Sequence, residues 1–159
     1  MQTLSEKVST LKPNSILMLA SKGEWSLHNL LPLLLNITGP ANISIASFSL
    51  SEESVRGFLL LKDERKILNL RCLFDYTMRS HKVDLMLFLD EIADELRTTP
   101  NHAKIMLIEN DDWSIAVMGS ANLTPNPRLE LTAVFANRPE FKQVKETFET
   151  AWTDAIPYS

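Results

Sequence analysis

The sequence has few of the features that mark secreted or membrane proteins. Cys72 is its only cysteine, so no disulfide bond can form within the chain, and a small secreted disulfide scaffold does not fit. The longest apolar runs, such as residues 29–37, are too short to cross a bilayer, and residues 1–14 lack the apolar core of a signal peptide. We therefore expect a cytoplasmic protein with no membrane segment.

Positive charge is also scarce. The chain carries 16 Lys and Arg against 20 Asp and Glu, a formal net charge of -4, which is unlike a protein that coats nucleic acid. Residues 56–82 differ, because they contain seven basic and three acidic residues. This segment predicts either a local surface for a phosphate backbone or an ordinary solvated surface. With 45% hydrophobic residues, the chain suits one globular domain, residues 1–159, around one core.

The hydrophobic pattern alternates between the two regular structures. Short apolar runs predict strands at residues 14–21, 43–49, 67–76, 102–109, 113–120 and 129–136. Apolar residues at helical spacing predict helices at residues 24–37, 51–62, 81–97 and 139–155. Strands alternate with helices in the first part and cluster in the second. The pattern therefore predicts an α/β fold with a mixed β-sheet flanked by helices on both faces.

Two of the predicted strands carry polar residues at a spacing of two. Strand side chains alternate between the faces of a sheet, so His102 and Lys104 project to the same side. Ser120 and Asn122 have the same relationship if the chain stays extended beyond the strand. Such pairs give each segment one polar face at the end of an otherwise apolar run.

Two further residues stand out near these pairs. Gly119 is one of only four glycines, and it lies where an apolar strand meets a polar loop, which predicts unusual torsions or a close approach of the backbone to a ligand. Glu130 interrupts the apolar strand predicted at residues 129–136. A lone carboxylate in such a strand needs a partner if it is buried.

These residues, in this order, resemble the motif of the phospholipase D superfamily. The motif is His-x-Lys, an acidic residue further along, and then Gly-Ser-x-Asn; here it reads His102, Lys104, Glu109, and GSAN at residues 119–122. The resemblance covers residues 43–135 and rests on two separated motifs in the right order. It implies a phospholipase D-like fold, with structural roles for Gly119 and for Glu109, which stands where the family usually has Asp.

The resemblance also implies phosphodiester hydrolysis without a metal or other cofactor. The His102 imidazole would attack phosphorus and form a covalent phosphohistidine, which splits the hydrolysis into two easier steps. Lys104, Asn122 and the Ser120 hydroxyl would hold the non-bridging oxygens. Glu130 would accept a hydrogen bond from the far nitrogen of His102 and fix its tautomer. The sequence contains no His/Cys/Asp cluster with metal-ligand spacing.

The implied mechanism needs a second histidine, which protonates the leaving oxygen and then activates water. His28 and His81 are the other histidines, and neither has a lysine two residues on. Family members this short dimerise, so that one motif from each chain meets across a two-fold axis. We therefore predict a homodimer with one composite site. Small single-motif members are similar to bacterial nucleases, which makes nucleic acid the expected substrate.

Other residues and other functions fit the pattern as well. Arg79 and Lys82 lie in a loop that would steer a phosphate backbone toward the site, although a plain solvated loop is the alternative. Ser49 lies at a predicted strand end near the expected cleft. A non-catalytic nucleic-acid- or phosphate-binding module, restriction- or phage-associated, would keep the fold and the anion pocket. The third possibility is an enzyme whose substrate is a lipid or another diester.

Overall fold

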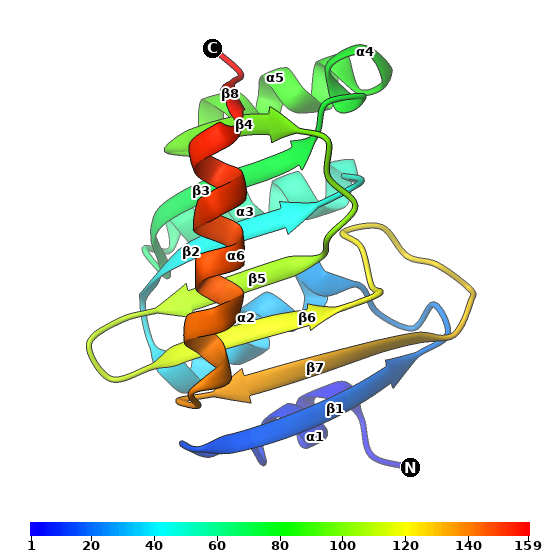
Figure 1. Cartoon of the computed structure of the whole chain (residues 1–159). Helices are drawn as coiled ribbons and strands as arrows, with labels where there is room; N and C mark the ends of the chain where they lie inside the picture. The colour runs from blue at the N-terminus through cyan, green and yellow to red at the C-terminus, as the bar shows by residue number, and fades with distance from the viewer.

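Eight strands pair into one mixed sheet, in the order β1-β7-β6-β5-β2-β3-β4-β8 (Figure 1). The computed structural model describes every residue from Met1 to Ser159. The strands are β1 (Ser15–Ser21), β2 (Ala41–Ser47), β3 (Ile67–Asp75), β4 (Glu95–Thr99), β5 (Ile105–Glu109), β6 (Ser114–Gly119), β7 (Glu130–Ala136) and β8 (Ile156–Pro157). Strands β2, β3 and β4 are parallel, and the other pairings are antiparallel. The carboxyl ends of β1, β2, β3, β4 and β6 therefore share one edge with the amino ends of β5 and β7.

Helices cover both faces of this sheet. They are α1 (Leu4–Val8), α2 (Leu27–Thr38), α3 (Glu52–Asp63), α4 (Met78–His81), α5 (Val83–Ile92) and α6 (Glu140–Asp154). Helix α6 crosses the near face in Figure 1, whereas α2, α3 and α5 lie behind the sheet. The predicted α/β fold, with a mixed sheet and helices on both faces, is confirmed. None of these helices combines the length and the apolar character that are needed to cross a bilayer.

One predicted helix is partly wrong. The pattern at residues 81–97 predicts a single helix, but α5 ends at Ile92 and the chain then forms β4. The Asp94 carboxylate accepts hydrogen bonds from the Leu70 N–H at 2.7 Å and from Lys62 Nζ at 2.8 Å, which fixes the turn. Strand β4 then completes the open edge of β3 and buries Leu96, which is 5% exposed. This tertiary pairing outweighs the local helical preference of the segment.

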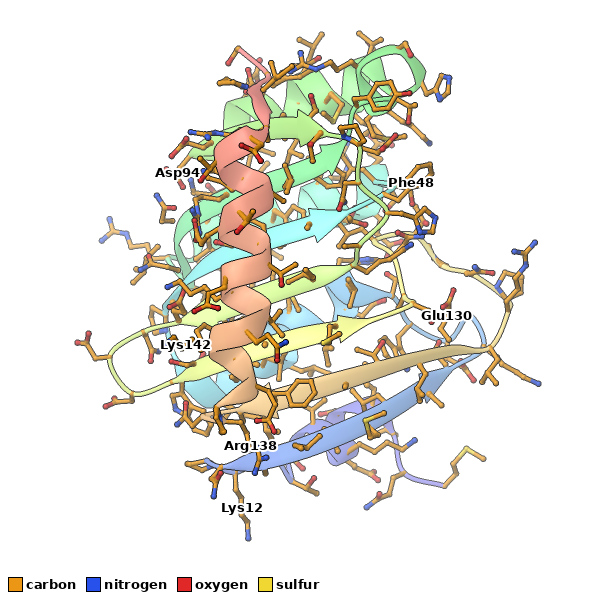
Figure 2. All side chains as sticks on the ribbon, viewed as in Figure 1. Lys12, Phe48, Asp94, Glu130, Arg138 and Lys142 are labelled. Carbon is orange, nitrogen blue, oxygen red and sulfur yellow. The ribbon has the colours of Figure 1, made fainter.

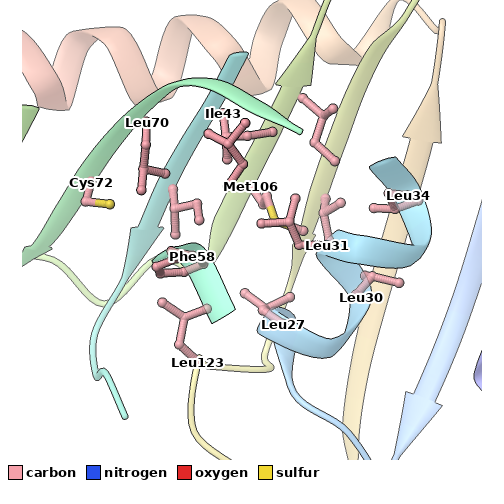
Figure 3. Close-up of a cluster of buried hydrophobic side chains, with 14 of the residues drawn as sticks. Leu27, Leu30, Leu31, Leu34, Ile43, Phe58, Leu70, Cys72, Met106 and Leu123 are labelled. Carbon is pink, nitrogen blue, oxygen red and sulfur yellow. The ribbon is translucent and has the colours of Figure 1, made fainter. Parts of the chain in front are cut away.

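The larger hydrophobic core lies between the sheet and the helices behind it (Figure 3). Helix α2 contributes leucines at helical spacing, each no more than 2% exposed: Leu27, Leu30, Leu31 and Leu34. Pro32 lies inside α2 without ending it. Cys72 is fully buried in the same core, and burial raises the pKa of its thiol. The cysteine is therefore a packing residue.

Helix α6 is anchored on the other face by a smaller core and by Arg71 of β3. Phe148 and Trp152 are buried beneath α6, and the Arg71 guanidinium lies 5.1 Å from the centre of each ring. Arg71 also donates to Glu149 Oε2 at 3.1 Å and to Ser44 Oγ at 2.9 Å. The guanidinium lowers the pKa of the Glu149 carboxyl. These contacts join α6 to the middle of the sheet.

Helix α6 leaves uncovered β1 and the ends of β6 and β7 that lie toward the strand-end edge (Figure 1). Four apolar side chains are exposed there: Ile16 at 47%, Met18 at 55%, Met118 at 42% and Leu131 at 52%. They share the α6 face, because Met18 and Met118 both pair with Ala133, and Ile16 pairs with Phe135 beneath α6. We call these four residues the apolar sheet patch. Contiguous exposed apolar side chains of this kind mark interaction surfaces.

Candidate active site

The predicted catalytic residues gather at the edge where the strand ends meet. His102 and Lys104 lie just before β5, and Ser120 and Asn122 lie just after β6. Neighbouring strands β5 and β6 pair Ile105 with Met118, so these segments leave the sheet side by side. The predicted face sharing of His102 and Lys104 within a strand is not formed, because β5 begins one residue later. The two side chains nevertheless meet.

The contact between His102 and Lys104 is the centre of the site. Lys104 Nζ lies 2.8 Å from Nδ1 of His102 and donates to the His102 backbone oxygen at 2.7 Å. A lysine ammonium has donors only, so Nδ1 of His102 is the acceptor in this contact. The His102 side chain is exposed, with the Phe48 ring centre 5.1 Å from its own. An exposed imidazole beside a cation is suited to meet a phosphate.

Lys104 itself is buried, with 8% exposure. Burial lowers the pKa of its ammonium, because it disfavours the charged form, and the charge of Glu130 opposes that effect. Its donors point to the ring and to the backbone of His102. An incoming phosphate oxygen would provide the stronger, charge-assisted partner for this ammonium.

Asn122 is held from the end of β2. Ser47 is completely buried, and its hydroxyl donates to Asn122 Oδ1 at 3.2 Å. In this orientation the amide oxygen faces Ser47, and the amide nitrogen is the donor that remains for a ligand. Next to it, the hydroxyls of Ser49 and Thr124 lie 3.0 Å apart. Ser49 therefore lies beside Thr124, which is not among the predicted site residues, and contact of Ser49 with substrate stays a prediction.

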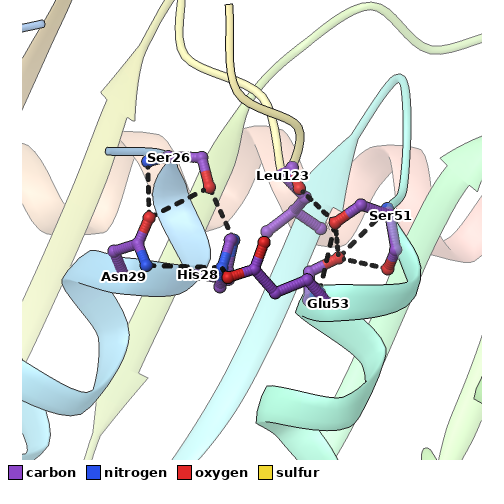
Figure 4. A network of polar contacts seen from close by, with 7 residues as sticks. Ser26, His28, Asn29, Ser51, Glu53 and Leu123 are labelled. Carbon is purple, nitrogen blue, oxygen red and sulfur yellow. Dashed lines mark hydrogen bonds and ion pairs between the residues drawn. The ribbon is translucent and has the colours of Figure 1, made fainter. Parts of the chain in front are cut away.

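The loop that carries Asn122 is also held from behind (Figure 4). The Leu27 N–H, at the start of α2, donates to the Asn122 backbone oxygen at 3.1 Å. The Ser51 hydroxyl, at the start of α3, donates to the backbone oxygen of Leu123 at 3.0 Å. His28 fills the space between the two helix starts, with Nε2 3.6 Å from a Glu53 oxygen. Two helix N-termini thus fix the loop after GSAN.

Gly119 and Ser120 join this loop to β7. A Cβ atom at Gly119 would lie 2.2 Å from the Leu131 backbone oxygen, so only glycine fits. The close approach at Gly119 is therefore to β7 of the same chain, whereas the approach to a ligand stays a prediction, and Gly119 does not have a positive φ. Ser120 Oγ accepts a hydrogen bond from the Leu131 N–H at 3.1 Å, which leaves its own hydroxyl proton available to a ligand.

Glu130 is not bonded to His102 in this structure. Its Oε1 accepts a hydrogen bond from Asn126 Nδ2 at 3.0 Å, within the loop that precedes β7. Strand β6 separates β7 from β5, and Figure 2 shows Glu130 at the same sheet edge, but below Phe48. The predicted contact with the far nitrogen of His102 is therefore absent from the single chain. Glu130 acts on the site through its charge, which raises the pKa of Lys104 against the effect of burial.

Glu109 and the basic segment serve the fold. Glu109 lies at the far end of β5 and accepts a hydrogen bond from Lys145 of α6 at 2.6 Å, which is consistent with a structural role. Arg79 was predicted to bind substrate, but its guanidinium donates to Thr98 at 2.6 Å and to the Pro157 oxygen at 2.9 Å. Lys82 is exposed between α4 and α5, at the β4 side of the sheet.

The predicted basic surface at residues 56–82 is largely neutralised. Its cations form ion pairs with carboxylates on several elements: Arg56 with Glu52, Lys62 with Asp94, Lys66 with Glu64 and Arg71 with Glu149. The local charge excess in the sequence therefore does not gather into one patch at the site. Two of these pairs, Lys62–Asp94 and Arg71–Glu149, join segments that are distant in the sequence, whereas the other two are local.

Asp75 and Asn101 are neighbours of the site that are not among its predicted residues. Asp75 ends β3 with 6% exposure, and from the sequence a strand-end cap is the favoured explanation of such a residue over a ligand contact. Asn101 directly precedes His102 and follows Pro100, a pair of residue types typical of turns. That turn signal beside the histidine motif was the available clue to Asn101.

Comparison with known proteins identifies the fold. No model of a known protein family and no curated protein matches the sequence. Among solved structures, Nuc from Salmonella typhimurium, a phospholipase D family member, has a TM-score of 0.68 at 18% identity, over 91% of this chain and 97% of that chain. NucT from Helicobacter pylori has a TM-score of 0.67 at 14% identity, over 91% and 100%.

A third similar structure has a different description. TrmBL2, an archaeal chromatin protein whose structure shows a novel mode of DNA binding, has a TM-score of 0.56 at 12% identity, over 87% of this chain and 54% of that chain. Similarity at these identities concerns the fold. The eight-stranded mixed sheet, with residues 102–104 and 119–122 at one edge, is therefore a phospholipase D-like fold.

Proposed function

We propose that this protein is a metal-independent phosphodiesterase that cleaves nucleic acid at a site shared by two copies of the chain. The observation that carries the proposal is the meeting of His102, Lys104, Ser120 and Asn122 at one sheet edge. A nucleophile, a buried cation and two neutral donors are the groups that a displacement at phosphorus requires. The fold shared with Nuc, a phospholipase D family member, supports the same class.

The reaction would proceed in two displacements. A nitrogen of one His102 imidazole attacks phosphorus, so that an N–P bond forms while the P–O bond to the leaving group breaks. The second His102 donates its proton to the leaving oxygen. Water then attacks phosphorus and gives a proton to the second His102, and the N–P bond breaks. Lys104 and the amide of Asn122 stabilise the charge on the non-bridging oxygens in both steps.

A second copy is needed because the chain has one suitable histidine. The His28 side chain is only 7% exposed and lies between two helices. His81 ends α4, at the β4 side of the sheet. The apolar sheet patch borders the site, since Met118 is followed by Gly119 and Ser120, and Leu131 follows Glu130. A second copy of this chain, bound on that patch, would bring the two strand-end edges together.

A groove beside the patch supports this choice of occupant. It has a volume of about 340 Å³, lies between β6, β7 and α6, and is lined by Met118, Phe135 and Val144, among others. Exposed Met18 and Leu131 stand on the same face. One two-fold interface can place the exposed side chains of each copy in the groove of the other, which gives the self-complementarity of a symmetric dimer.

Two cations near the site favour a polyanionic substrate. Lys22 follows β1 and Arg128 precedes β7, and both are exposed at the site edge of the sheet. Their loops adjoin, because Gly23 packs against the backbone of Asn126 and Pro127. Neither cation has an ion-pair partner within the chain, so both are available to phosphates that flank the scissile bond.

A second candidate is a nucleic-acid-binding module without catalysis. The similarity to TrmBL2, a chromatin protein that binds DNA, favours it. One experiment separates the two candidates. Wild type and His102→Ala are incubated with single-stranded and duplex oligonucleotides in EDTA, and His81→Ala is the matched control. Cleavage by wild type and by His81→Ala, with none by His102→Ala, supports the phosphodiesterase. Binding without cleavage by all three supports the module.

A further inference from the structure

The nucleophile lies on a crossover connection. The sheet order places β3 and β2 between β4 and β5, so residues 100–104 must pass over the ends of two strands before β5 begins (Figure 1). No strand ladder holds these residues. A connection of this kind varies in position unless other groups tie it down. The position of His102 therefore depends on contacts made by the residues beside it.

Asn101 makes those contacts with both strands that the connection crosses. Its backbone N–H donates to Asp75 Oδ1, at the end of β3, at 2.9 Å. Its side-chain nitrogen donates to the Ser47 backbone oxygen, at the end of β2, at 3.1 Å. Its side-chain oxygen accepts from the Ala103 N–H at 3.2 Å. The residues on either side of His102 are thus fixed to the sheet.

Asp75 is the charged residue among the groups that hold Asn101. Burial disfavours its carboxylate, but hydrogen bonds from Thr77 and Asn101 outweigh burial, and with the nearby His102 they lower the pKa of Asp75 below its ordinary value. The Thr77 N–H donates to the second oxygen, Oδ2, at 3.2 Å, together with the Thr77 hydroxyl. The buried carboxylate is therefore ionised, directionally bonded on both oxygens, and close to the imidazole.

We propose that Asp75 is a positioning residue for His102, acting through Asn101 to set the place of the imidazole over the ends of β2 and β3. The carboxylate also provides a fixed negative charge behind a ring that becomes positive as the N–P bond forms. The catalytic part of this inference rests on the proposed function, whereas the positional part does not. Displacements of about 1 Å at a reacting group cost about 10²-fold in rate.

The test uses two variants and a matched control. Asp75→Asn keeps the size of the side chain and removes its charge, and Asn101→Ala keeps the charge and removes the side-chain tie. Asp94→Asn is the control, because the Asp94 carboxylate also accepts a backbone N–H beside β3, from Leu70, but lies away from the site edge (Figure 2). Histidine-labelled protein reports nuclear Overhauser effects between the His102 and Phe48 rings, and turnover of a chromogenic phosphodiester gives kcat and KM.

We expect both variants to weaken the His102–Phe48 effects, and to lower kcat by about 10²-fold with KM nearly unchanged. Asp94→Asn changes stability alone. Unchanged ring contacts and unchanged kcat in both folded variants would overturn the positioning role. If wild type itself shows no turnover, the proposed function fails, and the ring contacts alone decide whether Asp75 positions His102.

Discussion

Lys104 Nζ lies 2.8 Å from Nδ1 of His102, and the same nitrogen donates to the backbone oxygen of His102 at 2.7 Å. In the unliganded chain the buried ammonium thus has its strongest contacts with the residue that would attack phosphorus. In the proposed reaction, a phosphate that reaches the site would exchange this contact for a charge-assisted one and release Nδ1. The pair would then link substrate binding to the state of the nucleophile.

Replacing Lys104 separates its catalytic role from its packing role. Lys104→Met keeps the buried apolar stem and removes the charge, so we expect the fold to survive and kcat to fall by about 10²- to 10³-fold. Lys12→Met is the control, because Lys12 precedes the amino end of β1, at the sheet edge opposite the site (Figure 2). Initial rates on a chromogenic phosphodiester measure the effect. Equal rates for the two variants would remove Lys104 from the site.

Gly119 gives a prediction about stability. Because a Cβ atom would lie 2.2 Å from the Leu131 oxygen, Gly119→Ala should lower the free energy of unfolding by about 1–3 kcal/mol. Gly57, inside α3, has open space around the same position, so Gly57→Ala should raise it by about 0.5–1 kcal/mol. Urea unfolding of both variants measures these changes. An unchanged free energy of unfolding for Gly119→Ala would mean that β6 and β7 can move apart there at little cost.

The apolar sheet patch gives a prediction about assembly. Met118→Lys and Leu131→Glu place charges in the proposed interface, so each should shift the wild-type dimer toward an 18 kDa monomer. Leu60→Lys is the control, because Leu60 is 57% exposed on α3, behind the sheet. Sedimentation equilibrium at micromolar concentration measures the change. A dimer that persists in both patch variants would locate the interface elsewhere, and a monomeric wild type would refute the shared site.

Asp75 gives a prediction about acid stability. Its pKa is lowered in the folded state, so its contribution to stability is present above its unfolded pKa, about 3.9, and is lost as the pH falls through the folded value. Asp75→Asn should therefore be about 1–3 kcal/mol less stable than wild type at pH 7, and the difference should shrink below pH 4. Chemical unfolding across this range tests the sign. A constant difference would mean that the charge contributes nothing.

The sequence predicts which residues form the candidate site better than it predicts how the chain around His102 is held in place. The spacing of His102, Lys104 and residues 119–122 is local information, and two neighbouring strands bring these segments together. Parity along a strand predicted that His102 and Lys104 share a face. In the structure, the two side chains are in contact although residues 102–104 lie in the connection before β5. Hydrogen bonds of Asn101, including one to Asp75, hold this connection where no strand pairing does. Asn and Asp often cap strands and turns, so their presence in the sequence does not show that Asn101 and Asp75 hold the connection that carries His102.

Two differences between the predictions and the structure arise from long-range pairing, and a third arises from a local contact. The helix predicted at residues 81–97 ends early, because residues 95–99 pair with the open edge of β3 as β4. Arg79 reads as a loop cation, but the β8 backbone takes its guanidinium. The family motif predicts Glu130 as the partner of His102, but the Glu130 carboxylate accepts a hydrogen bond from Asn126, four residues earlier in the chain. In each case, a partner that the sequence pattern does not identify decides the outcome.

The most direct test of the proposed function is detection of the covalent intermediate. Wild type, His102→Ala and His81→Ala are mixed in EDTA with a nucleoside 5′-p-nitrophenyl phosphate, quenched in alkaline denaturant, and mapped by mass spectrometry. Attack on phosphorus would release p-nitrophenolate and leave a nucleotidyl group on His102, on at most one of the two chains of each dimer. Turnover by His102→Ala, or release of p-nitrophenolate by wild type under single-turnover conditions with no adduct on His102, would contradict the mechanism.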